Sequence, residues 1–189
     1  MPIIQLLNIF ILYCLIPLWI AVGFADWLCH RAADIGKTAG AKESALHLLM
    51  LAEIGIPLLA GLFLEINALV LLIMLAGLLA HEATSLWDLH YAHSKRDISP
   101  IEQHVHSFQE VIPMVLFAVV CILNWDQAAA LLAWSDDANF SLEWKRNPLP
   151  VVYLASVLGL TALFVGLPFV EEFLRAVRQG GMRGAAKSG

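Results

Sequence analysis

Three carboxylate and histidine pairs in this sequence have the spacing of side chains that share one face of a helix. The pairs are Asp26 with His30, Glu43 with His47, and Glu102 with His106. Residues four apart on a helix stack on the same face, so both side chains of a pair can reach one point in space. Glu110 follows four residues after the third pair and extends it into a ladder. Imidazole and carboxylate together are ligands that suit iron, manganese or zinc.

Further candidate ligands lie near these pairs in the sequence. Glu53 lies about a turn and a half beyond His47, inside an apolar segment, where an unpaired carboxylate is costly and a bound cation would relieve the cost. The predicted metal ligands are Asp26, His30, His47, Glu53, His81, Glu82, His90, His93, Glu102, His106 and Glu110. More than six candidates at one bundle end predict two metal ions. We expect Asp88, Gln103 and Gln109 to hold the free ring nitrogens of ligating histidines.

Other ionisable residues are interpreted as solvated. Glu43 falls in a loop that water can reach, and His104 points away from the ladder on its helix. Glu171 and Glu172 follow the last apolar segment and are interpreted as solvated acids at a helix end. The segment 94–97 carries two cations beside an acid, which is typical of a solvated turn or of a contact with a lipid phosphate.

The segments that must position these residues are apolar and long. Of the 189 residues, 60% are hydrophobic and only 14% are charged, a balance typical of membrane proteins. Runs of about 20 apolar residues can cross a bilayer as helices, and they occur at 3–25, 45–64, 68–89, 101–124 and 151–169. The sequence therefore predicts an all-α, polytopic membrane helix bundle of about five spans. It forms one domain over 1–175, with a loop at 125–150, a short helix at 127–134 within it, and a tail at 176–189.

The distribution of basic residues predicts the orientation. Lys and Arg concentrate after the first span, after the third span and in the tail, which alternating spans place on one side. Cytoplasmic loops carry such an excess, so the N-terminus should lie outside, and the C-terminus and all seven histidines at the cytoplasmic side of a bacterial inner membrane. The net charge of −5, with 11 Lys plus Arg, argues against nucleic acid as a partner. Three cysteines without a CxxC pair predict no disulfide.

The layout resembles that of the membrane-bound di-iron desaturases and hydroxylases of lipids, whose histidines gather at the cytosolic face of a few spans. The resemblance covers the first four spans. That family carries His-x-x-His-His boxes, and the matching segment here is His90-Tyr91-Ala92-His93, without the adjacent second histidine. Asp26, His30 and the later His47 are also similar to the copper site of membrane methane and ammonia monooxygenases, which implies copper as an alternative metal.

The leading functional hypothesis is a membrane di-metal oxidoreductase that activates oxygen on a lipid or another hydrophobic substrate. Two iron ions are the preferred cofactor, with zinc, manganese and copper as alternatives. No dinucleotide or flavin fingerprint is present, so electrons would come from a separate reductase or ferredoxin. Two other hypotheses are a zinc-dependent membrane hydrolase and a non-enzymatic membrane subunit that binds a metal or haem, either a metal-ion carrier or a haem-bearing anchor subunit of a redox complex. The lipid bilayer is a further expected partner, and the oligomeric state is left open.

Overall fold

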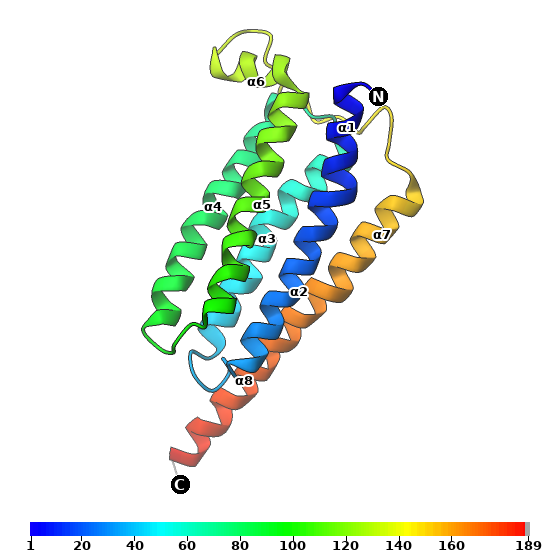
Figure 1. Cartoon of the computed structure of the whole chain (residues 1–189). Helices are drawn as coiled ribbons and strands as arrows, with labels where there is room; N and C mark the ends of the chain where they lie inside the picture. The colour runs from blue at the N-terminus through cyan, green and yellow to red at the C-terminus, as the bar shows by residue number, and fades with distance from the viewer. Residues whose placement is uncertain (188–189) are drawn as a thin grey trace.

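Most of the chain forms five long apolar helices, which lie side by side (Figure 1). The computed structural model describes residues 1–187, with side chains for residues 1–180. The helical segments are α1 (Ile3–Phe10), the π-helical turn η1 (Ile11–Leu15), α2 (Ile16–Ala32), α3 (Ala41–Phe63), α4 (Ala68–His93), α5 (Pro100–Leu123), α6 (Trp125–Leu132), α7 (Val151–Thr161), the π-helical turn η2 (Ala162–Gly166) and α8 (Leu167–Lys187).

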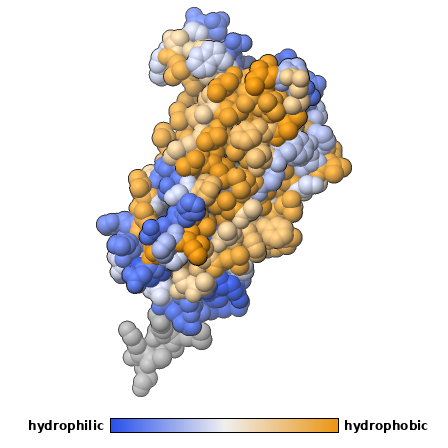
Figure 2. All heavy atoms as spheres, in the orientation of Figure 1, coloured by the Kyte–Doolittle hydropathy of each residue, from blue (hydrophilic) through white to orange (hydrophobic). Residues whose placement is uncertain are grey.

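These segments confirm the predicted fold class. The helices that are long and apolar enough to cross a membrane are Ile3–Ala32, Ala41–Phe63, Ala68–His93, Pro100–Leu123 and Val151–Gly180. Figure 2 shows a broad apolar surface over the bundle, with polar residues gathered towards its two ends. Lipid chains can solvate such a band, so the chain is an integral membrane protein.

The helices are longer than the apolar runs at the end where the ionisable residues gather, the lower end of Figure 1. α2 continues to Ala32 and α4 to His93, which carries the helices past the predicted ligands. The predicted separate tail is continuous with α8 as far as Lys187, and the side chains of Arg183 and Lys187 lie outside the described residues. At this end the polar side chains of one helix have partners on its neighbours, so the helices can continue beyond their apolar parts.

Capping side chains define where two helices begin. The side chain of Ser99 accepts a hydrogen bond of 3.2 Å from the backbone nitrogen of Glu102, with Pro100 at the first helical position of α5. The side chain of Asn67 accepts one of 3.1 Å from the backbone nitrogen of Val70 at the start of α4. Both caps satisfy backbone donors that a helix leaves free in its first turn.

The bundle is apolar in its upper half and polar at its lower end. Residues of the upper core include Leu15, Ile16, Leu62, Leu71 and Met74, all buried. α3 packs along α4 and α8, while α2 packs along α5 and η2. The approach of α3 to α4 depends on Gly77, because a Cβ there would lie 2.5 Å from the carbonyl oxygen of Glu53 and would clash with the ring of Pro57.

We expect Gly77→Ala to destabilise the protein by about 1–3 kcal/mol, because the added methyl group would push α4 away from α3. The matched control is Gly55→Ala on α3, where nothing lies within 4 Å of the new Cβ. Thermal unfolding of the two variants in detergent measures the difference. A Gly77→Ala variant as stable as Gly55→Ala would contradict this packing.

Candidate functional site

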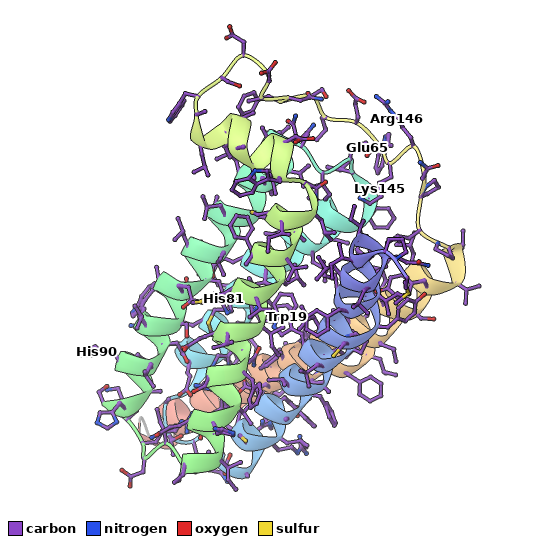
Figure 3. All side chains as sticks on the ribbon, turned by 45° about the horizontal axis from the view of Figure 1, so that its top comes forward. Trp19, Glu65, His81, His90, Lys145 and Arg146 are labelled. Carbon is purple, nitrogen blue, oxygen red and sulfur yellow. The ribbon has the colours of Figure 1, made fainter. Side chains whose placement is uncertain are left out.

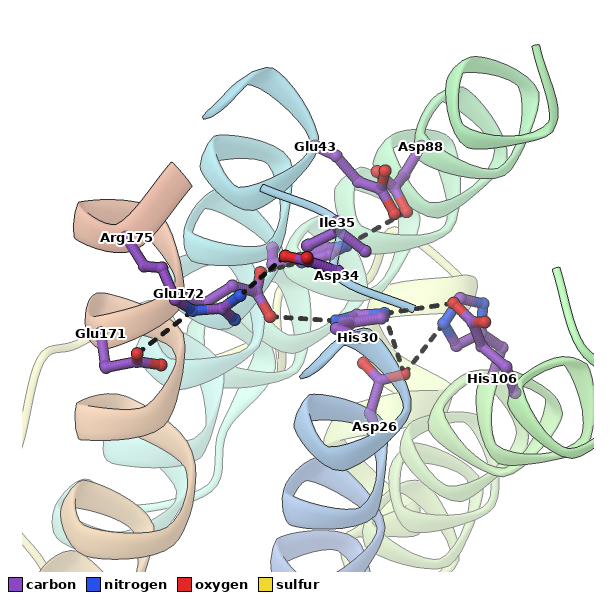
Figure 4. Close-up of polar contacts among 12 residues, drawn as sticks. Asp26, His30, Asp34, Ile35, Glu43, Asp88, His106, Glu171, Glu172 and Arg175 are labelled. Carbon is purple, nitrogen blue, oxygen red and sulfur yellow. Dashed lines mark hydrogen bonds and ion pairs between the residues drawn. The ribbon is translucent and has the colours of Figure 1, made fainter. Parts of the chain in front are cut away.

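Ionisable side chains from five helices meet at the lower end of the bundle (Figure 4). We call this group the ionisable cluster. It contains Asp26 and His30 from α2, Glu43 and His47 from α3, Asp88 from α4, Arg96 from the loop after α4, Glu102 and His106 from α5, and Glu172 from α8. The predicted ligands Asp26, His30, His47, Glu102 and His106 are therefore brought together.

His30 lies at the centre of the cluster and is fully buried. Its Nε2 lies 3.3 Å from Asp26 Oδ1 and 3.6 Å from Glu102 Oε1, and its Nδ1 lies 3.3 Å from Glu172 Oε2. Its ring stacks on that of His47, with 4.2 Å between the ring centroids. The imidazole of His30 thus joins α2 to α3, α5 and α8.

Both ring nitrogens of His47 face carboxylates. Nδ1 lies 2.8 Å from Glu172 Oε1, and Nε2 lies 3.4 Å from Asp88 Oδ2. Asp88 therefore holds a histidine ring, as expected of it. Gln109 was expected to do the same but instead donates a hydrogen bond of 2.9 Å from Nε2 to Asp26 Oδ2.

Arg96 holds two acids together, which corrects the interpretation of Arg96 and Glu43 as solvated, whereas the rest of the segment 94–97 is exposed. The guanidinium side chain is only 4% exposed and donates to Glu43 Oε1 at 2.6 Å and to Glu102 Oε2 at 2.9 Å, with a further short contact to Glu102. Burial opposes the charged form, but the hydrogen bonds that Arg96 donates to Glu102 and Glu43 hold the pKa of Arg96 above its usual value. The loop turns inwards because these two carboxylates pair with the guanidinium of Arg96 at a place away from water.

The cluster holds more negative than fixed positive charge. Its five buried carboxylates are those of Asp26, Glu43, Asp88, Glu102 and Glu172. Arg96 is the only Lys or Arg side chain of the cluster. Buried charges are costly unless they are paired, so the histidines or a bound cation must compensate for the remaining acids.

Glu172 was interpreted as a solvated acid, and this was wrong. It is fully buried and lies in a stripe of buried residues on one face of the last span, with Val165, Phe169 and Ala176. Their spacing of four, three and four residues is that of a helix face that packs on a neighbour. This spacing was visible in the sequence, but the double acid Glu171-Glu172 at the end of an apolar run is typical of a solvated helix end.

The structure places the other predicted ligands outside the cluster. Glu53 accepts a hydrogen bond of 2.8 Å from the hydroxyl of Thr84, between α3 and α4. Glu110 accepts one of 3.0 Å from the hydroxyl of Ser85, between α4 and α5. Glu82 is half-buried, and its Oε1 has no hydrogen-bond partner among the described residues.

Histidines 81, 90 and 93 are not in the cluster either. His90 and His93 are exposed and line an open groove of about 620 Å³ between α4 and α5, together with Gln103, His106 and Glu110. His81 is buried inside the bundle, whereas His90 lies on the outer side of α4 (Figure 3). The metal-binding roles assigned to all these residues stay predictions.

Two half-open pockets lie between the helices beside and above the cluster. The lower one, of about 100 Å³, is lined by Asp26, His47, His81, Asp88 and His106 at its polar end and by mostly apolar side chains elsewhere. The upper one, of about 160 Å³, is largely apolar and reaches Asn8, Asn124 and Lys145 at the upper end. Their shared walls contain Ile16, Trp19, Ile54 and Leu58. Trp19 points into the bundle between them (Figure 3).

Lys145 places a positively charged side chain at the upper end of this interior. It lies in the loop before α7, and its Nζ donates a hydrogen bond of 2.8 Å to the carbonyl oxygen of Leu64. Burial lowers the pKa of this amine. The interior thus has acids and histidines at one end and a lysine at the other.

A polytopic bundle with charged groups inside and pockets between its helices has the architecture expected of a membrane transport protein. The model of the sodium:solute symporter family matches residues 2–152, which is most of the chain. The chain belongs to the sodium:solute symporter family. Comparisons with curated proteins and with solved structures gave no match.

The family contradicts the predicted oxidoreductase, and with it the two-iron cofactor, the oxygen chemistry, the lipid metabolism, the hydrophobic substrate and the electron donor. The hydrolase and haem-subunit alternatives fall with it. The physical reason is that a carboxylate and histidine pattern is common to metal centres and to charged sites inside transport proteins. The many predicted ligands that favoured two irons also do not meet at one point. Glu102 is bonded to Arg96, and His90 and His93 are exposed.

Arg96→Ala should cost about 3–5 kcal/mol of stability, because it leaves Glu43 and Glu102 buried without their cation. Thermal unfolding in detergent checks this. Arg146→Ala is the control, since its ion pair with Glu143 is exposed and should contribute less than about 1 kcal/mol. Adding Glu43→Gln and Glu102→Gln to Arg96→Ala should recover part of the loss. Equal effects of the two arginine variants would refute the role of Arg96.

Proposed function

We propose that this protein is a membrane carrier that moves a solute through its helix bundle together with a sodium ion. Membership of the sodium:solute symporter family supports this function. The fold agrees with it, because the chain consists of spans with polar groups inside the bundle. Ionisable residues at membrane depth are costly and mark ion or substrate pathways when they face the interior.

The observation that carries the proposal is that the two pockets between the helices are neighbours and share part of their walls. They share Ile16, Trp19, Ile54 and Leu58 as walls and together extend from the ionisable cluster to Asn124 and Lys145. The groove between α4 and α5 reaches the other side of the cluster, because His106 lines both the groove and the lower pocket. A solute that passes the side chains of Trp19 and His106 would cross the whole bundle.

Glu53 and Thr84 are the proposed ligands of the sodium ion. Hard cations take oxygen ligands, and this pair offers a carboxylate and a hydroxyl without an imidazole. The Oε2 atom of Glu53 is buried and has no hydrogen-bond partner among the described residues. A carboxylate in that position lacks compensation, and a sodium ion beside it would supply the positive charge.

Glu53→Gln should abolish saturable binding of ²²Na⁺ to the detergent-purified protein, because the amide keeps the shape but removes the charge. Thr84→Val should weaken binding, by about tenfold if one ligand contributes about 1.4 kcal/mol. Glu143→Gln, in the exposed loop, is the control and should bind as the unchanged protein does. Absence of sodium binding to the unchanged, folded protein would overturn sodium coupling.

We further propose that the lower end faces the cytoplasm, because lysines and arginines lie in the loops 33–40 and 94–99 and along α8. A green fluorescent protein fused after residue 189 should then fluoresce in bacterial cells, while alkaline phosphatase at the same position should be inactive. The opposite pair of results would invert the orientation.

A further inference from the structure

Three nitrogen and oxygen atoms of the ionisable cluster converge on one point. They are Asp26 Oδ1, His30 Nε2 and His106 Nε2, all within 4.8 Å of one another. Asp26 Oδ1 lies 3.3 Å from His30 Nε2 and 2.9 Å from His106 Nε2. α2 supplies the first two residues one turn apart, and α5 supplies the third from the opposite wall.

These separations are those of ligands around a small divalent ion. Metal bonds from nitrogen and oxygen measure about 2.0–2.2 Å at zinc, so two ligands of a tetrahedron stand about 3.4 Å apart. The measured 3.3 Å agrees with that edge, and 2.9 Å is somewhat below it. A metal ion held by these three residues would have a fourth position open.

Two of the three residues carry buried polar atoms without a hydrogen bond. Asp26 Oδ1 and both ring nitrogens of His30 are buried without a hydrogen-bond partner among the described side chains, although their neighbours are close. Such atoms are rare, because a buried polar atom without a partner costs about 1–3 kcal/mol. A bound cation would give these atoms a partner.

Two polar groups lie behind the three atoms, where the outer groups of metal sites are found. Glu172 Oε2 lies 3.3 Å from Nδ1 of His30, and Gln109 donates to the second oxygen of Asp26. A ligating histidine commonly gives its other nitrogen to a carboxylate, which fixes the orientation of its ring. Glu172 comes from α8, so the last span would orient a ligand on the first.

The neighbouring group of His30, Glu43 and His47 offers no comparable site. The carboxylate of Glu43 is bonded to Arg96, and both nitrogens of His47 face carboxylates. Glu102 Oε1 lies 3.6 Å from His30 Nε2 but is also held by Arg96. Convergence of potential ligand atoms, together with the unsatisfied atoms of Asp26 and His30, therefore favours Asp26, His30 and His106.

We infer that Asp26, His30 and His106 bind one divalent metal ion of borderline softness, and that this ion is the solute of the carrier. The inference rests on the proposed function and concerns an ion that is carried, with no redox chemistry. Two imidazoles and one carboxylate favour such an ion over sodium or magnesium, which prefer oxygen ligands. An open fourth position suits exchange, and His106 faces both the lower pocket and the groove through which an ion could enter.

Titration of the metal-free, detergent-purified protein with Co²⁺ tests the site, because the visible absorption of Co²⁺ reports its ligands. We expect one Co²⁺ per chain with tetrahedral absorption, and no competition from excess Mg²⁺. Asp26→Asn and His106→Ala should each weaken binding at least about 100-fold, and Glu172→Gln about 10–100-fold. His104→Ala, two residues along α5 on an exposed side chain, is the matched control and should bind normally.

Replacing His106 by another metal-binding residue keeps the test valid even if the alanine variant folds poorly. His106→Cys should retain Co²⁺ and add a sulfur-to-cobalt charge-transfer band, which only a direct ligand can produce. No saturable Co²⁺ binding, or binding that is equal in the His104→Ala and His106→Ala variants, would overturn the site. Measuring ²²Na⁺ binding in the same preparation separates the two proposals. If the protein binds sodium but not Co²⁺, only the metal site is refuted. If it binds Co²⁺ but not sodium, only sodium coupling is refuted. Co²⁺ that binds to the protein but does not enter proteoliposomes, either with or without a sodium gradient, would refute the metal ion as the solute.

Discussion

The burial of five carboxylates at one end of a membrane bundle is the constraint on which the rest of this structure depends. Each buried charge is stable only with a partner, and the chain gathers partners from every span. Arg96 turns the loop after α4 inwards, His30 and His47 lie between acids of different helices, and Glu172 ties α8 to both rings. In lipid there is little hydrophobic force between helices, so these polar contacts contribute to holding the lower end together.

The two halves of the bundle are therefore held by different forces. Close packing holds the upper half, where α3 approaches α4 at Gly77 and an apolar core fills the centre. Charge pairing holds the lower half, where packing leaves a pocket beside Asp26, Asp88 and His106. A site that must exchange a cation requires this division, because a fully packed and fully paired interior has no place for a ligand.

The buried acids differ in whether their oxygens have hydrogen-bond partners. This difference separates acids with a structural role from acids with a functional role. Glu43 and Glu102 are occupied by Arg96, so their removal would act on stability. Asp26 Oδ1, the nitrogens of His30 and Oε2 of Glu53 lack hydrogen-bond partners among the described residues. These are the positions where a cation would lower the free energy most, and they lie on the proposed route. The donor atoms differ between them, oxygen alone beside Glu53 and nitrogen with oxygen beside Asp26, which favours different ions at the two places.

The sequence by itself determined the number of spans, the all-helical class and the meeting of Asp26, His30, His47, Glu102 and His106. Hydrophobic runs reveal spans because lipid forbids unpaired backbone, and a spacing of four residues places side chains on one helix face. Tertiary structure decided which of the remaining polar residues face inwards. Arg96 and Glu172 have the local sequence of solvated residues, and only the neighbouring helices give them buried partners. The sequence pattern also could not separate a redox centre from a transport site, because both use the same carboxylates and imidazoles. Membership of the sodium:solute symporter family made that distinction, while the helix rotations that decide which side chains converge are encoded in no local spacing.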